Sequence, residues 1–180
     1  VTIAEGLGVV VALVVLLLTF GSALAAGIPL LTSLIGVAAS MTVIFAATRF
    51  TEITSTAPFL GLMIGLAVGI DYALFVVHKH RTLIVSTGRS AQDVVGEAVG
   101  TAGSAVLFAG LTVVIALLGL LTLGIAFVNT MALTAATTVT LAVLIALTAL
   151  PALLGLVGER VASNRARQAA QRPGRHRIAN

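Results

Sequence analysis

Long uncharged blocks dominate the pattern of hydrophobic and polar positions along this chain. No charged residue occurs between Glu5 and Arg49 or between Glu97 and Glu159, and each interval is long enough for two membrane-spanning helices of about 20 residues. Glycine and proline residues divide these blocks and a third apolar stretch between them. The pattern predicts five transmembrane helices, at about residues 6–25, 28–47, 58–77, 105–123 and 127–156.

The connections between these helices differ in polarity. Gly21, Gly27 and Pro29 mark a first turn that carries no charge and must be tight. The second connection, residues 48–57, carries charged and hydroxyl side chains. Pro58 then suits the first position of a helix, where its missing N–H group is not needed, so we expect the third span to begin there.

A polar interval, residues 78–103, separates the third predicted span from the fourth. Within it, Ser90 and Asp93 have the spacing of a helix-capping pair, and apolar residues then repeat at helical intervals as far as Ala102. This pattern predicts a short amphipathic helix that lies on the membrane before the fourth span.

Composition leads to the same class of protein. Hydrophobic residues make up 59% of the chain and charged residues 9%, and the mean hydropathy is +1.17. Soluble domains are roughly half apolar and about one-quarter charged. The predicted fold class is therefore all-α, a polytopic membrane bundle of five transmembrane helices plus a short amphipathic cytoplasmic helix. We expect residues 1–158 to form this membrane domain and residues 159–180 to be a disordered basic tail.

The basic residues indicate the orientation of the bundle, because short loops rich in Lys and Arg stay in the cytoplasm. Arg49 lies alone on one predicted side, whereas Lys79, Arg81, Arg89 and the six arginines of residues 159–180 lie on the other. We therefore expect the amino terminus outside and the carboxyl terminus in the cytoplasm. The tail would anchor this topology; contact with anionic lipids is the alternative. Nothing besides charge supports nucleic-acid binding, and none is expected.

One acidic residue lies inside a predicted span. If the third helix begins at Pro58, Asp71 lies about 20 Å along it, roughly two-thirds of the way across a hydrocarbon core of about 30 Å. An ionised carboxylate at that depth costs at least about 2.5 kcal/mol, so Asp71 should face protein or water rather than lipid. This cost favours the neutral carboxyl group, which makes Asp71 a candidate proton carrier. A hydrogen bond to Thr112 or Thr137 on a neighbouring helix is the structural alternative.

The third predicted helix has two distinct faces. One is a stripe of small residues spaced by four, which lets another helix approach closely: Gly61, Gly65, Gly69 and Ala73. At about 100° per residue, Asp71 points nearly opposite Gly69. Its own face is shared by Ile64, Ala67, Phe75 and His78. We expect the stripe to pack within the bundle and the Asp71 face to meet something else.

Two polar side chains accompany Asp71. Tyr72 is the only tyrosine, and its hydroxyl lies on the flank of this face, where it can hydrogen-bond a carboxyl group of a facing helix. His78, two turns further on, is able to pass a proton between Asp71 and water. Because His78 adjoins the basic residues 79–81, simple polarity at the membrane boundary is the alternative reading of it.

Three segments resemble a known family. They are G-L-A-V-G-I-D-Y-A-L-F at 65–75, A-V-L-F-A-G-L-T-V-V-I-A-L-L-G-L at 105–120 and L-T-A-L-P-A-L-L-G at 147–155. Together they resemble the MMPL (mycobacterial membrane protein large) branch of the resistance-nodulation-division transporters. The resemblance covers residues 1–158. Such transporters consist of two similar halves, each with one span, a large extracytoplasmic domain and five further spans, and this chain is similar to spans two to six of one half.

The resemblance implies a proton-driven exporter of lipids or other hydrophobic molecules in the bacterial inner membrane. Asp71 and Tyr72 match the pair that carries the protons opposite an equivalent pair in the other half, and Phe75 matches an aromatic position beside that relay. Ala109 departs from the pattern, because many relatives have serine there. The expected partner is the missing second half or, failing that, a second copy of this chain in a parallel homodimer. Because the sequence begins at Val1, we expect it to be part of a longer protein.

Two other classes of function are open to such a chain. A lipid-binding module like the sterol-sensing domains shares the five-span architecture without transport, although a retained acidic relay argues against it. An intramembrane aspartyl protease needs two carboxylates that share the work, and only Asp71 is available. No H-E-x-x-H or G-x-S-x-G motif occurs either. We therefore expect no enzyme, no metal and no cofactor.

Overall fold

The computed structural model describes residues 2–20 and 23–161 of the chain. Within these ranges every regular element is helical. In chain order the elements are α1 (Thr2–Phe20), α2 (Ala23–Ala47), α3 (Ala57–Thr87), α4 (Ala91–Ala98), the π-helix η1 (Val99–Gly103), α5 (Ser104–Gly119), the 3-10 helix η2 (Leu120–Leu123) and α6 (Ala126–Val161). The predicted tail falls outside the described residues from position 162 onward.

Among the described residues, four helical segments are long and apolar enough to cross a membrane. They are Ala26–Ala47, Ala57–Thr87, Gln92–Leu123 and Ala126–Leu156, and α1 contributes the shorter apolar segment Gly6–Val15. These segments confirm the predicted class, an all-α membrane bundle.

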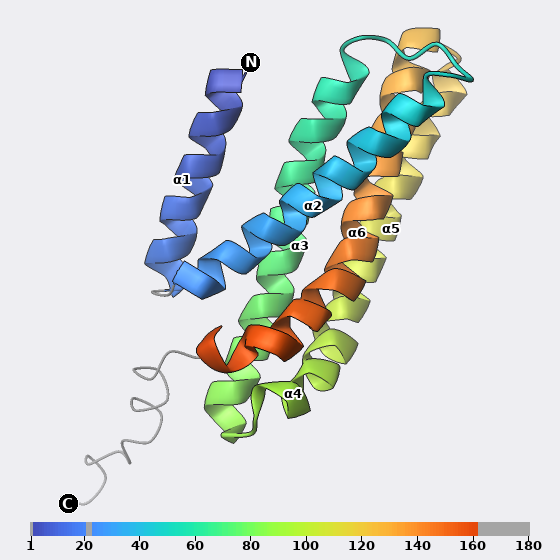
Figure 1. Cartoon of the computed structure of the whole chain (residues 1–180). Helices are drawn as coiled ribbons and strands as arrows, with labels where there is room; N and C mark the ends of the chain where they lie inside the picture. Colours follow the sequence, from blue (N-terminus) through green and yellow to red (C-terminus); the bar gives the residue numbers. More distant parts are fainter. Residues whose placement is uncertain (1, 21–22, 162–180) are drawn as a thin grey trace, which may run out of the picture.

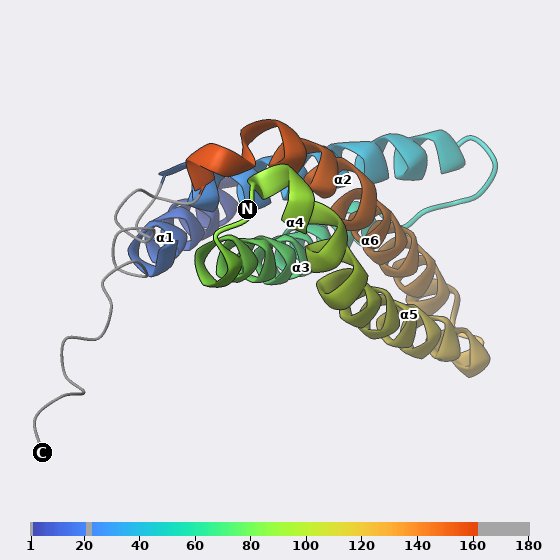
Figure 2. The same cartoon turned by 90° about the horizontal axis from the view of Figure 1, so that it is seen from below.

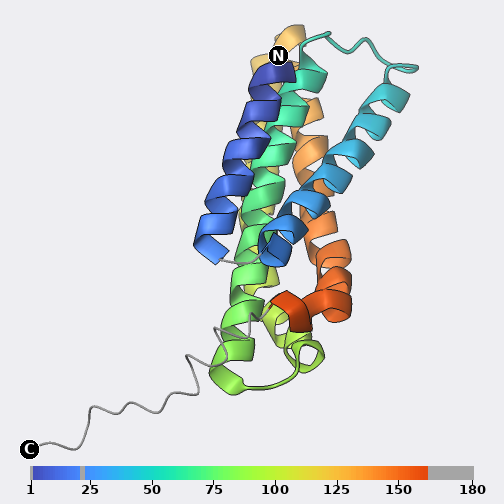
Figure 3. The same ribbon diagram turned by 60° about the vertical axis from the view of Figure 1, so that its left-hand side comes forward.

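Three helices, α2, α3 and α6, form the centre of the bundle. In Figure 1, α2 crosses α3 and α6 obliquely, and Figure 2 shows α1 and α5 on opposite flanks of this central group. The start of α1, the connection between α2 and α3, and η2 lie at one end of the bundle, which we call the loop end. The carboxyl end of α3 and α4 lie at the other, the α4 end. In Figure 3, α2 diverges from α3 toward the loop end.

The small-residue stripe of α3 faces the other two central helices. Gly61, Gly65, Gly69 and Ala73 are all buried. A Cβ atom built on Gly69 would lie 2.9 Å from the Cβ of Ser33 in α2. One built on Gly61 would lie 3.0 Å from the hydroxyl oxygen of Thr138 in α6. The missing side chains therefore allow both neighbours to approach the backbone of α3.

Three predicted helix boundaries are wrong. The first helix ends at Phe20 rather than at residue 25. Pro29 lies inside α2, which begins at Ala23, so Gly27 and Pro29 do not form the predicted first turn. Gly21, the other residue of that predicted turn, lies outside the described residues. Membrane helices tolerate an internal proline because neighbouring groups and small local adjustments satisfy the backbone that it frees. The third helix runs to Thr87 instead of residue 77, and it ends at Gly88, whose φ of 65° is the left-handed conformation typical of a helix end.

The predicted amphipathic helix exists, but its apolar face packs on protein. α4 begins after Ser90, whose hydroxyl accepts a hydrogen bond from the backbone N–H of Asp93, the capping pair that the sequence predicts. Val94 and Ala98 are 0% exposed and pack in one cluster with Leu83 and Ile84 of α3. The expectation that this helix lies on the membrane surface is therefore wrong. The extension of α3 supplies the apolar surface that α4 covers.

Candidate functional site

Asp71 lies near the middle of α3, on the face turned away from the stripe that packs against α2 and α6. The exposed side chains follow one another at helical spacing along this face. They are Ala67, Asp71, Phe75 and His78, and Ile64 and Tyr72 beside them are partly buried. The packing of α3 through its glycines thus leaves the carboxyl group on the outer side of this bundle.

A shallow groove of about 260 Å³ runs between α3 and α5 at this position. Its lining combines Asp71, Tyr72 and Phe75 of α3 with Ala105, Val106 and Ala109 of α5. The carboxyl group is the only ionisable group in this lining besides the phenol of Tyr72. Ala109, where the resemblance leads one to expect serine, therefore belongs to the wall of the Asp71 groove.

Gly110 positions α5 next to Tyr72. A Cβ atom at Gly110 would collide with the side chain of Val143 in α6 and would lie 3.6 Å from Cε2 of Tyr72. Because this glycine has no side chain, α5 packs close to α6 while the ring of Tyr72 lies alongside it. The ring is thereby held between α3 and α5, next to the carboxyl group that precedes it in sequence.

The structure does not show the alternative role of Asp71, a hydrogen bond to Thr112 or Thr137 on a neighbouring helix. Thr112 donates its hydroxyl to the carbonyl of Phe108 at 2.8 Å, and Thr137 donates to the carbonyl of Leu133 at 2.8 Å. Both threonines therefore bond to their own helices. Across the described residues, the side chain of Asp71 makes no hydrogen bond or ion pair.

The two histidines near the site have opposite environments. His78 is exposed on the Asp71 face, toward the α4 end. His80 is fully buried, on the same side of α3 as Ala73, Val76 and Val77. Sequence reasoning did not single out His80, although it follows Ala73 by seven residues, about two helical turns, which places it on the side of α3 that carries the stripe. Across the described residues no three histidine, aspartate or glutamate side chains gather as a metal site would require.

Comparison with known proteins identifies the chain. A model of the MMPL family matches residues 1–179. The chain belongs to the MMPL family. The resemblance seen in the segments around Asp71, in α5 and in α6 is thereby confirmed, and the chain is a multi-pass membrane protein of a transporter family.

Three curated relatives show how much of such a protein this chain spans. It is 48% identical, over 88% of its length, to membrane protein YdfJ of Bacillus subtilis. Over 72% of its length it is 33% identical to the mycolic acid-containing lipids exporter MmpL11 of Mycolicibacterium smegmatis. Over 82% of its length it is 31% identical to the trehalose monomycolate exporter MmpL3 of Mycobacterium tuberculosis. The matches cover 22%, 13% and 16% of these three proteins, so the chain corresponds to less than a quarter of each.

Proposed function

We propose that this chain is part of the transmembrane region of an exporter of lipids or other hydrophobic compounds, driven by the proton gradient, with Asp71 and Tyr72 as the proton relay. The observation that carries the proposal is the exposure of Asp71 in the groove between α3 and α5, halfway along a membrane-spanning helix. A carboxyl group at that depth in a membrane raises the free energy of the protein unless another polar group contacts it, so such residues usually have a function.

Proton uptake at Asp71 changes what this face of α3 can contact. The ionised carboxylate requires hydrogen-bond donors or cations, whereas the neutral carboxyl group tolerates an apolar neighbour at much lower cost. A second helical bundle packed on this face would therefore have two preferred arrangements, one for each protonation state. Binding and release of the proton then shift the population between them, which is the event that transport requires.

The neighbours of Asp71 fit roles in that exchange. Tyr72, held beside α5, presents a phenol that can donate a hydrogen bond to a carboxylate on the facing bundle. His78, exposed on the same face toward the α4 end, connects the groove with water on that side. Phe75 lies on the same face between Asp71 and His78 and is 51% exposed, so its ring lines the path from the carboxyl group to that end.

Lipids are the inferred class of cargo. Two relatives are named as exporters of mycolic acid-containing lipids and of trehalose monomycolate. The named compound differs between them, so we extend to this chain only the broad class, lipids or other hydrophobic compounds.

The test removes the charge of Asp71 without changing its shape, in the protein as its host makes it. Asp71→Asn should abolish export and proton flux in membrane vesicles while the amount of folded protein stays unchanged. Glu52→Gln is the matched control, because it neutralises an exposed carboxylate in the loop between α2 and α3. Normal export by Asp71→Asn would refute the relay. Lipid binding that persists in wild type and Asp71→Asn alike, without any proton flux in either, would instead favour a lipid-binding module of the sterol-sensing kind.

A further inference from the structure

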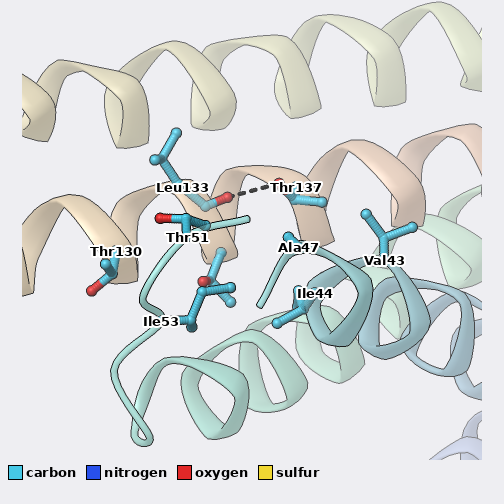
Figure 4. A pocket seen from close by; sticks show the side chains of 9 residues that line it. Val43, Ile44, Ala47, Thr51, Ile53, Thr130, Leu133 and Thr137 are labelled. Atoms are coloured by element: carbon cyan, nitrogen blue, oxygen red, sulfur yellow. Dashed lines mark hydrogen bonds between the residues drawn. The ribbon is translucent and has the colours of Figure 1, made fainter. Parts of the chain in front are cut away.

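A second groove lies at the loop end, on a different side of the bundle from Asp71. Figure 4 shows it between the last turns of α2, the loop that follows α2, and the first half of α6. Its volume is about 260 Å³. The lining residues come from these three segments: Val43, Ile44 and Ala47; Thr51 and Ile53; Thr130, Leu133, Thr134 and Thr137.

The groove is mainly apolar, although four threonines line it. Thr137 donates its hydroxyl to the carbonyl of Leu133 at 2.8 Å, as Figure 4 shows, and Thr130 donates to the carbonyl of Phe127 at 2.9 Å. These hydroxyl hydrogens are therefore used within α6 itself. With the aliphatic residues around them, the threonine methyl groups leave a surface suited to hydrocarbon rather than to a polar ligand.

The rim of the groove lies in the membrane-spanning part of the chain. Val43 in α2 is 45% exposed and Leu133 in α6 is 50% exposed, and both belong to segments that are apolar enough to cross a membrane. At the loop end the groove is bounded by the connection to α3, which is tied to α6 by a hydrogen bond of 3.0 Å between the hydroxyls of Thr54 and Thr130. The groove is thus open sideways, toward lipid, and bounded toward water.

Size and chemistry point to one kind of occupant. A dry apolar cavity of about 150 Å³ is enough to bind benzene in a protein, so this groove has room for a longer piece of hydrocarbon. The neighbouring medium at the rim consists of the acyl chains of membrane lipids.

The floor of the groove rests on the backbone of α3. A Cβ atom on Gly61 would lie 3.1 Å from Cγ2 of Thr134 and 3.5 Å from Cδ1 of Ile44, and both of these residues line the groove. The stripe that packs the central helices together therefore also shapes this groove, because a larger residue at Gly61 would push its walls apart.

We propose that the groove between α2, the loop after it, and α6 is a binding site for one acyl chain of a membrane phospholipid from the leaflet at the loop end. The acyl chain enters between Val43 and Leu133. Its methylene groups pack against Ile44, Ala47 and Thr137. This site does not involve Asp71, and it goes beyond the proposed proton relay.

Photo-cross-linking tests the site in the protein as its host makes it, reconstituted in vesicles of phosphatidylethanolamine and phosphatidylglycerol. The probe is a phosphatidylglycerol with a diazirine in one acyl chain, and mass spectrometry locates the cross-links. Labelling of residues 43–53 and 130–137 should saturate with probe concentration and be displaced by the unlabelled lipid. Labelling of the exposed Ile115 in α5 should rise without saturation.

Two substitutions fill the groove from opposite walls. Thr137→Phe from α6 and Ala47→Phe from α2 should each reduce the saturable labelling about tenfold or more, the effect of losing the burial of roughly two methylene groups. Thr140→Phe is the matched control, because Thr140 is exposed on the same helix and bonds the carbonyl of Ala136 at 2.8 Å, yet it lies outside the groove. Thr137→Val keeps the shape of the groove and should label like wild type.

Several outcomes would overturn the proposal. They are labelling of the groove that never saturates, labelling that survives in both Phe variants, and labelling that is lost in Thr137→Val, since the last would assign binding to the hydroxyl. Asp71→Asn should keep full labelling even if it stops export. A failure of this inference is thereby distinguishable from a failure of the proton relay.

Discussion

Gly65 of α3 and Thr138 of α6 lie so close together that a Cβ atom on Gly65 would be 2.5 Å from Cγ2 of Thr138. Both residues are buried, and the Thr138 hydroxyl bonds the carbonyl of Thr134 at 2.9 Å. The contact is therefore a methyl group against bare backbone. It fixes the distance between the two helices, and with it the rotation of α3 that turns Asp71 outward.

Gly65→Ala should destabilise the bundle by about 1–3 kcal/mol, because the added methyl group cannot fit without moving α3 or α6. Chemical unfolding in detergent micelles measures the effect. Thr138→Ser removes the colliding methyl group, so the double variant should recover most of the loss. As a control, Gly96→Ala in α4 has nothing within 4 Å of the added atom and should be neutral or slightly stabilising. Equal losses at Gly65 and Gly96 would contradict this packing.

The cap of α4 should control how firmly that helix is held on α3. Ser90→Ala removes the acceptor for the Asp93 N–H and should cost about 1 kcal/mol of local stability. Hydrogen exchange of residues 91–98 should become faster while exchange in the centre of α3 stays unchanged. Ser86→Ala is the comparison, since the Ser86 hydroxyl bonds the carbonyl of Leu83 and caps no helix start. If the two variants exchange alike, the cap does not hold α4.

The sequence allowed the helices to be predicted where a single physical signal decides them. Long uncharged runs predicted the membrane class, and the spacing of Gly61 to Ala73 predicted the stripe that the structure buries. The end of α3 was missed because polarity marks where a helix leaves the membrane, not where the helix stops. The beginning of α2 was missed because Gly27 and Pro29, which usually mark a turn, lie within this helix. The segment from His78 to Thr87 is polar but contains no glycine or proline, and α3 continues until Gly88.

Only the part of the candidate site that lies on α3 could be predicted from the sequence. Helical periodicity gave the face of Asp71, because all of its members lie on one helix. The share of α5 in the groove depends on the close approach permitted by Gly110, a contact between distant segments that no local pattern reveals. The position of α4 was also not predictable from a local pattern, because its apolar face has the same periodicity whether it covers protein or lipid.

Labelling of single cysteines should establish the orientation that the basic residues predict. Ser55 in the loop between α2 and α3 and Ser86 near the end of α3 are both exposed, at opposite ends of the bundle. Because this chain has no cysteine, Ser55→Cys and Ser86→Cys each introduce one thiol. An impermeant maleimide added outside intact cells should label Ser55→Cys at once and Ser86→Cys only after the cells are opened. The reverse pattern would invert the topology, and labelling of both from outside would rule out a spanning α3.

The exposed face of Asp71 should be covered by a second helical bundle in the protein as its host makes it. Phe75 is 51% exposed on that face, whereas Phe45 is 60% exposed on α2, away from it. The chain has no tryptophan, so Phe75→Trp and Phe45→Trp report on their surroundings by fluorescence. In bilayers that contain this chain alone, lipids with brominated acyl chains should quench both. In the protein as its host makes it, with any other tryptophans replaced, quenching should persist at Phe45→Trp and fall at Phe75→Trp.

Shielding of Phe75→Trp in the chain alone, together with disulfide cross-links between copies through Phe75→Cys but not Phe45→Cys, would establish the parallel homodimer. Full quenching at Phe75→Trp in every preparation would mean that lipid covers Asp71, and the proton relay would then lack the facing group on which it depends.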